Sequence, residues 1–279
     1  SLILSEINEI KLINDENYTV LNKFHEDFYL KKNIKSKLQV YDPSFLGKSD
    51  KLKSYDFCAK IYDRILRDIS IELNTLHNCN LNYRSWEIIF GNWLRYFVWI
   101  CYERYTSINK SINNIKPKEI IIRVSNNFNF STEDTWGIYE NSIDDQWNGN
   151  LYYKILKYLN INNLSIFHYN SIENAKKQNI LKNKKIGYKK TILKKVLNIF
   201  ALIKPKKSAV IINSYLPLLY EKLFELFLFQ IPRYWDFEFL NYKKYDNRVR
   251  EKINLNFENK ICVENFIRKN IKFFLPNSI

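Results

Sequence analysis

Two polar clusters in the sequence combine residue types that bind anions or sugar hydroxyls and that transfer protons. The first is "HNCNLNYRSW", residues 77–86, where a run of asparagines interrupts an apolar helical pattern. Ser85 predicts a helix cap, which would place His77 and Arg84 beside a helix N-terminus. Backbone N–H groups and the helix dipole favour a phosphate or carboxylate there. The competing interpretation of His77 is a hydrogen-bonded structural histidine.

The second cluster is "NSIDDQWNGNLYYKIL", residues 141–156, which leads into an amphipathic helix. Asp144 predicts the cap of that helix, so the adjacent Asp145 has no capping role. Trp147 and Asn148 follow it closely. An acid and an amide supply fixed acceptors for hydroxyl groups, and an indole packs on the C–H face of a pyranose. The cluster therefore predicts a sugar site.

The sequence lacks the common cofactor and metal motifs. It has no GxxxxGK[ST], GxGxxG, HExxH or GxSxG, and its five glycines are too few for a glycine-rich phosphate loop. His25, His77 and His168 lie far apart with no ligand at metal-binding spacing. No CxxC occurs among the four cysteines, which indicates free thiols in a reducing cytoplasm. We predict no metal and no cofactor.

Apolar periodicity predicts strands that alternate with long helices. Short β-branched or aromatic runs predict strands at 2–4, 18–21, 37–41, 119–124, 164–169 and 208–215. Helical patterns occupy 55–77, 86–115, 144–159, 188–203, 217–230 and 257–273. This alternation predicts a single α/β domain over residues 1–279, a Rossmann-like, mainly parallel sheet flanked by helices. Such sheets bind ligands at the carboxyl ends of their strands.

The helix expected at 86–115 has a stripe that is typical of a buried core. The stripe comprises Trp86, Ile89, Trp93, Tyr96, Phe97 and Ile100. Since no apolar run approaches the roughly 20 residues that span a bilayer, we predict a chain that does not cross the membrane.

The charge of the chain leaves several partners open. Lys+Arg 44 against Asp+Glu 29 gives a net charge of +15, part of which reflects a composition rich in Asn, Ile and Lys. The stretch "NYKKYDNRVREK" (241–252) could bind nucleic acid, but no known nucleic-acid motif accompanies it, which disfavours this partner. The lysine-rich stretch at 174–195 is either a sheet-covering helix or a contact with anionic lipid at the inner face of the membrane.

Three blocks of the sequence resemble transferases encoded in bacterial surface-polysaccharide loci. They are "LNTLHNCNLNYRSWEIIFGNWLRYFVWICYERY", "DDQWNGNLYYKIL" and "NSYLPLLYEKLFELFLFQIPRYW". Asn92, Glu103 and Tyr105 depart from the pattern that this family more often shows. The resemblance implies a GT-B-like glycosyltransferase of about twice this length. This chain would then be its N-terminal, acceptor-side half, and the donor-binding domain would lie outside it.

The same resemblance implies roles for individual residues. His77 and Asp145 are the candidates for the catalytic base, and Arg84 and Arg104 would neutralise phosphate. Trp86, Trp147 and Asn148 would contact sugar, whereas Trp93 belongs to the core. The partners would be a nucleotide-sugar donor and a glycan or lipid-linked acceptor, without a metal. The alternative is a non-catalytic basic module that binds nucleic acid or another anionic polymer.

Overall fold

The computed structural model divides the chain into two compact units. The first comprises Ser1–Ser171 and Tyr242–Ile279, and the second comprises Ile172–Asn241. The structure describes residues 1–6, 17–21, 26, 27, 29, 37–41, 48–126, 128–132, 134–169, 220, 223, 247–255 and 261–276. Only Tyr220 and Leu223 of the second unit are described, so the fold below is that of the first unit. The single domain over 1–279 stays a prediction.

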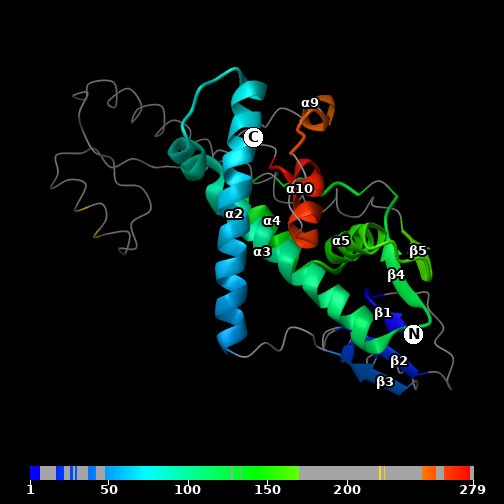
Figure 1. Cartoon of the computed structure of the whole chain (residues 1–279). Helices are drawn as coiled ribbons and strands as arrows, with labels where there is room; N and C mark the ends of the chain where they lie inside the picture. The colour runs from blue at the N-terminus through cyan, green and yellow to red at the C-terminus, as the bar shows by residue number, and fades with distance from the viewer. Residues whose placement is uncertain are drawn as a thin grey trace. The chain divides into compact units, whose positions relative to one another are not determined.

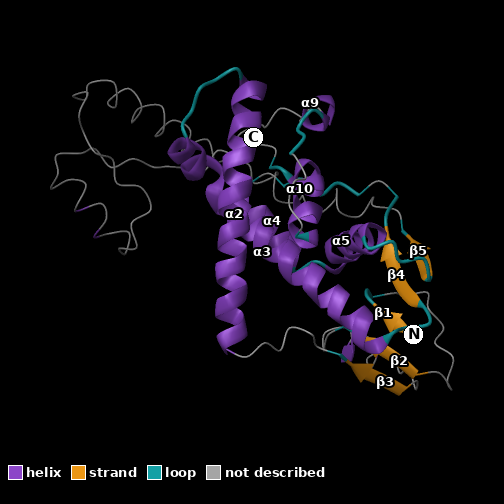
Figure 2. Cartoon of the chain, viewed as in Figure 1, coloured by secondary structure: helices purple, strands orange, loops and turns teal. Residues whose placement is uncertain are grey.

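A five-stranded parallel sheet has the order β3-β2-β1-β4-β5. The strands are β1 (Leu2–Ile3), β2 (Asn17–Val20), β3 (Lys37–Val40), β4 (Ile120–Val124) and β5 (Leu164–His168). They lie together beside the long helices in Figure 2. The predicted α/β class and parallel sheet are confirmed, with strands found at five of the six predicted places. The sixth, at 208–215, lies outside the described residues.

The sheet separates two apolar clusters because successive side chains of a strand point to opposite faces. On one face, Leu2, Ile120 and Ile122 belong to the main core with the helices. On the other face, Ile3 and Ile121 belong to a smaller cluster whose further buried members are Tyr18, Val20 and Tyr29. Both faces are therefore covered, as the β-branched and apolar composition of these strands predicts.

Two long helices, α2 (Lys48–His77) and α3 (Tyr83–Ile115), pack against each other (Figure 1). The core side of α3 carries Phe90, Trp93 and Phe97, whose rings stack in sequence with centroids 5.1 and 5.0 Å apart. Of the predicted stripe, Trp86, Trp93, Phe97 and Ile100 are buried. Ile89 and Tyr96 are instead 55% and 45% exposed, so the prediction was wrong for these two. A second apolar stripe, on the solvent side of α3, includes them.

Three shorter helices also contribute buried side chains to the main core. They are α4 (Thr135–Ser142), α5 (Asp145–Tyr158) and α10 (Cys262–Phe274), and a short α9 (Asn247–Glu251) precedes the last. α5 begins as predicted, because the Asp144 side chain accepts a hydrogen bond from the Trp147 N–H. α4 and α9 were not predicted. The predicted helices at 188–203 and, for all but two residues, 217–230 lie outside the described residues.

A buried ion cluster joins α10 to α2 across most of the sequence. Glu264 on α10 has a fully buried side chain and accepts hydrogen bonds from Arg64 and Arg268. Arg268 also pairs with Asp68, 2.5 Å from its carboxylate. Because Glu264 has a cation on either side, its charge is compensated inside the core.

The described part of the chain contains no helix that is both long enough and apolar enough to cross a bilayer. Its four cysteines, Cys58, Cys79, Cys101 and Cys262, are free thiols, as predicted.

Candidate functional site

The strand order creates a switch point between β1 and β4. From β1 the chain adds β2 and then β3 on one side, whereas β4 and β5 add on the other side. Connections leave in opposite directions at such a place, which opens a crevice beyond the carboxyl ends of the two strands. Ser5 and Glu6 follow β1 at this edge, and Ser125 follows β4. A ligand site is therefore expected among the polar groups at the carboxyl ends of β1 and β4.

The N-terminus of α5 lies against the end of β1. The backbone N–H of Glu6 donates to Oδ2 of Asp145 over 3.0 Å. Ser5 accepts at Oγ from the Arg123 N–H over 2.7 Å, and its carbonyl accepts from the Tyr29 hydroxyl over 2.9 Å. Asp145 also stands in the first turn of α5, where a negative charge is stabilised by the helix dipole. The Asp145 carboxylate is thus held beside the end of β1.

The ends of β4 and β5 are joined by one asparagine of α5. Asn150 accepts a hydrogen bond from the Ser125 N–H at 3.0 Å and donates to the Tyr169 hydroxyl at 2.9 Å. The Arg123 guanidinium carbon lies 4.9 Å from the centre of the Tyr169 ring. Burial raises the pKa of Tyr169 to about 12, so its phenol stays protonated at neutral pH. We call Ser5, Glu6, Arg123, Asp145, Asn150 and Tyr169 the switch-point cluster.

Gly149 lets α5 approach the sheet closely. A Cβ atom at this position would stand 2.7 Å from the Arg123 carbonyl oxygen, a backbone atom that no rotamer change can move. Any side chain here would push the helix away from β4.

We therefore expect Gly149→Ala to lower the free energy of unfolding by about 1–3 kcal/mol, because overpacking outweighs the better helix propensity of alanine. Urea unfolding measures this change. Gly137→Ala is the matched comparison, since the atoms nearest its Cβ would belong to side chains, with Thr132 Cβ at 3.0 Å and Asp134 Oδ1 at 3.6 Å. An equal or larger loss in that variant would contradict the importance of the backbone contact.

The side chains of Arg104 and Asn148 form a hydrogen bond. Nε of Arg104 donates to Oδ1 of Asn148 over 2.9 Å, and a terminal nitrogen donates to the Ser142 carbonyl over 3.2 Å. Arg104 also pairs with Glu103. Burial acts to lower the pKa of Arg104, but Coulomb interactions with Tyr152 and Glu103 outweigh it and leave the pKa raised. Arg104 is thus a permanent cation that ties α3 to α4 and α5.

The two tryptophans assigned to sugar contact lie in the core. Trp147 is 1% exposed and packs edge-on against Phe130 and Phe274. Trp86 is 4% exposed, and its Nε1 donates to Oδ1 of Asn74 over 2.9 Å. Neither indole presents an open face on which a pyranose could stack. Their positions on the apolar sides of α3 and α5 explain this burial.

In the turn between α2 and α3, the residue that caps α3 differs from the predicted one. The cap of α3 is Asn82, not Ser85, and the Asn82 side chain accepts from the N–H and the hydroxyl of Ser85. This acceptor occupies an N–H that an anion would use. Arg84 lies inside the first turn and pairs with Glu87 at 2.5 Å, with 73% of its side chain exposed. His77 is exposed at the end of α2, its ring centre 6.1 Å from that of Trp86.

The two predicted clusters do not meet. Arg84 and Arg104 are both on α3, 20 residues apart, which is about 30 Å at 1.5 Å per residue. His77 and Arg84 therefore belong to one end of the helix, whereas Arg104, Asp145, Trp147 and Asn148 belong to the other. A single site at the switch point includes Asp145 and excludes His77.

Residues that sequence reasoning missed complete the switch-point cluster. Ser5, Arg123 and Tyr169 each stand at or beside the carboxyl end of a predicted strand, which is the signal that could have found them. Among the described residues, no group of three or more His, Cys, Asp or Glu side chains could hold a metal ion.

Comparison with known proteins identifies a family. The model of the LIC12162 family transferase matches residues 1–279, so the chain belongs to this transferase family. No curated protein and no solved structure matches the chain.

Proposed function

We propose, from the premise of membership in this transferase family, that the chain is the acceptor-side part of a glycosyltransferase with a GT-B architecture. Its donor would be a nucleotide-activated sugar and its acceptor a glycan or lipid-linked sugar of surface-polysaccharide assembly. The catalytic base would be Asp145. Transfer would proceed without a metal and in the cytoplasm. The family match supports transfer in preference to the alternative of a non-catalytic basic module.

The observation that carries the proposal is the position of Asp145. Its carboxylate accepts from the Glu6 backbone at the end of β1, the strand that borders the switch point. A base must lie within hydrogen-bond reach of the acceptor hydroxyl, and a crevice at a switch point is where an α/β sheet binds its ligand. His77, the other candidate, is the last residue of α2 and does not stand at the end of a described strand.

In the proposed transfer, three side chains of this chain would take part: Asp145, Arg123 and Tyr169. Asp145 would take the proton of the acceptor hydroxyl while that oxygen forms the new bond to the anomeric carbon of the donor. The bond from that carbon to the donor phosphate breaks, and the nucleotide leaves with the electron pair. Arg123 would supply positive charge toward the phosphates, and the protonated Tyr169 would supply a hydrogen-bond donor at the same edge.

The other predicted residues have supporting roles in this scheme. Arg104 would position Asn148 and the start of α5, because its donors reach both Asn148 and the Ser142 carbonyl. A contact with anionic lipid through residues 174–195 stays a prediction, since this stretch lies outside the described residues.

Ligand-induced thermal shift of the intact protein tests the proposal. A panel of UDP-, GDP-, dTDP- and CMP-linked sugars is added in turn, because a ligand that binds only the native state raises Tm by mass action. We expect one nucleotide class to raise Tm, by an amount that grows with its concentration. The absence of any shift, together with salt-sensitive binding of RNA or DNA, would replace the proposal with the basic binding module.

A further inference from the structure

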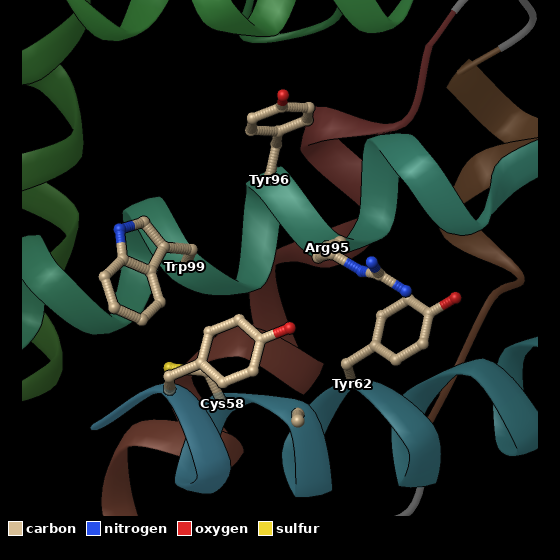
Figure 3. A pocket seen from close by; sticks show the side chains of 7 residues that line it. Cys58, Tyr62, Arg95, Tyr96 and Trp99 are labelled. Atoms are coloured by element: carbon tan, nitrogen blue, oxygen red, sulfur yellow. The ribbon is translucent and has the colours of Figure 1, made fainter. Parts of the chain in front are cut away.

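A pocket lies between α2 and α3, lined by side chains of both helices (Figure 3). Its volume is about 310 Å³, within the range of small-molecule sites. The lining consists of Tyr55, Cys58, Ala59, Tyr62, Arg95, Tyr96 and Trp99. Apart from one guanidinium, this lining is aromatic or apolar, so the pocket favours a ligand with an apolar body.

The pocket continues an apolar surface that two faces of the helices share. On α3, Ile88, Ile89, Tyr96 and Trp99 are exposed along one side, separate from the buried stripe. On α2, Leu52 and Tyr55 are more than half exposed and precede Ala59 at helical spacing. Single exposed apolar residues are common on protein surfaces, but a contiguous group of them around a concave surface usually marks a binding site.

Positive charge is confined to one end of the pocket. The Arg95 guanidinium carbon stands 5.2 Å from the centre of the Tyr62 ring, and Figure 3 shows the two side chains together, apart from Trp99. Within the described residues, Arg95 has no ion-pair partner. The neighbouring carboxylates of Asp63 and Glu87 are already paired, with Arg67 and Arg84 respectively.

The opposite end of the pocket is uncharged. Tyr55 and Trp99 lie there, and Leu52 extends the α2 side by one more turn. Cys58 between the two ends adds no charge, because burial raises the pKa of its thiol to about 12. From Tyr55 to Tyr62 the pocket follows α2 for seven residues, or about 10 Å. The pocket is thus elongated, cationic at one end and apolar along the rest.

Tyr62 adds a second polar group at the cationic end. It is nine-tenths buried, and its hydroxyl interacts with the Arg95 guanidinium but forms no hydrogen bond of regular geometry with any described residue. The hydroxyl lies over Gly91, where a Cβ atom would stand 2.5 Å from it. A buried hydroxyl without a regular hydrogen bond costs free energy, which an acceptor atom from a ligand would recover.

We propose that this pocket binds an anionic single-chain amphiphile, with the acidic head group at Arg95 and Tyr62 and the acyl or isoprenoid chain along Ala59, Tyr55 and Trp99. Guanidinium groups form strong charge-assisted hydrogen bonds to carboxylate and phosphate, and the aromatic rings bury the chain. The site is independent of the proposed transfer reaction. Arg95 and Arg104 are nine residues apart, two and a half turns, so they project from opposite sides of α3.

Quenching of tryptophan fluorescence by a bromine-tipped fatty acid, bromoundecanoate, tests the proposal below the micellar limit of the probe. We expect saturable quenching that Trp99→Phe largely removes, because Trp99 lines the apolar end. Dodecyl phosphate should compete with the probe, whereas dodecyl maltoside and dodecyltrimethylammonium should compete at least tenfold less well. Because the three competitors share a dodecyl chain, differences between them report recognition of the head-group charge and not burial of the chain.

Two variants and their controls locate the binding. Arg95→Gln should weaken the probe about tenfold or more, and Lys110→Gln, which removes a charge elsewhere on α3, should not. Ala59→Phe should fill the exposed mouth and abolish saturation, while Thr75→Phe on the far end of α2 should leave it unchanged. Each variant must retain the wild-type Tm for this comparison.

Three outcomes would overturn the proposal. The first is a lack of saturable quenching. The second is equal competition by all three head groups with no effect of Arg95→Gln. The third is dimerisation that Ala59→Phe abolishes, since a second copy of the chain would then be the occupant.

Discussion

Asp145→Asn in the intact protein should lower kcat for sugar transfer by about 10²–10⁴-fold and leave KM for the donor nearly unchanged. General-base catalysis contributes a factor of this size, and an amide cannot take the proton of the acceptor hydroxyl. The amide oxygen can still accept the hydrogen bond from the Glu6 backbone, so the local structure is preserved. The assay follows release of nucleotide from the sugar donor that gives the largest thermal shift.

Asp144→Asn is the matched control for this variant. Asp144 caps α5 through the Trp147 N–H, and asparagine caps helices as well as aspartate does. The control therefore removes one negative charge from the same turn without removing the base, and turnover within about threefold of wild type is expected. Wild-type kcat in Asp145→Asn, or equal losses in both variants, would exclude Asp145 as the base.

Glu264→Gln should lower the free energy of unfolding at neutral pH by about 3 kcal/mol. The substitution removes the buried carboxylate that pairs with both Arg64 and Arg268, and breaking a buried ion pair by removing one partner costs about 3–5 kcal/mol. The lower end of that range applies because Arg268 keeps its pair with Asp68, and Arg64 is 38% exposed and can be solvated. Urea unfolding of both proteins, followed by circular dichroism, measures the difference.

The effect of Glu264→Gln should depend on pH in a defined direction. Burial acts to raise the pKa of Glu264, but hydrogen bonds from Arg64 and Arg268 outweigh burial and leave this pKa lowered. Its stabilisation is thus complete above the ordinary glutamate pKa of about 4.3 and is lost as the pH falls through the lower folded-state pKa. The difference between variant and wild type should therefore shrink in acid.

Glu87→Gln provides the comparison, because the Arg84–Glu87 pair lies at the surface, with most of Arg84 exposed. We expect a change of less than about 1 kcal/mol for this variant. A similar loss in both variants at neutral pH would mean that the buried cluster contributes no more than a surface pair.

The sequence allowed the strands and the long helices to be predicted because their apolar periods are local. β4 and α3 each have a clear period, and the structure places them within a few residues of the predicted positions. Periodicity does not tell which side of a helix meets the core when two sides are apolar. Ile89 and Tyr96 were therefore assigned to the core of α3, although both are exposed.

The candidate site was predictable only in part, for a different reason. Asp145 could be proposed from the sequence because Asp144 was expected to cap the helix, and the structure confirms this cap. Ser5, Arg123 and Tyr169 could not be grouped with it, because the order of strands in a parallel sheet depends on long-range packing. The alternation of strand and helix patterns along the sequence shows where strands lie in the chain. It does not show which strand ends are neighbours in the sheet.

The close packing of α5 at Gly149 has a consequence for how substrate preference can diverge. The distance of Asp145 from β1 and β4 is fixed by main-chain atoms, through the Arg123 carbonyl and the Glu6 N–H. Tyr169 contacts α5 through its hydroxyl and can be exchanged without moving this frame, whereas Ser5 is buried and binds the Arg123 N–H through its Oγ. A library that varies position 169 and keeps Gly149 should therefore yield folded proteins with altered donor binding, since the Asp145 carboxylate and the Tyr169 phenol are held by separate parts of the chain.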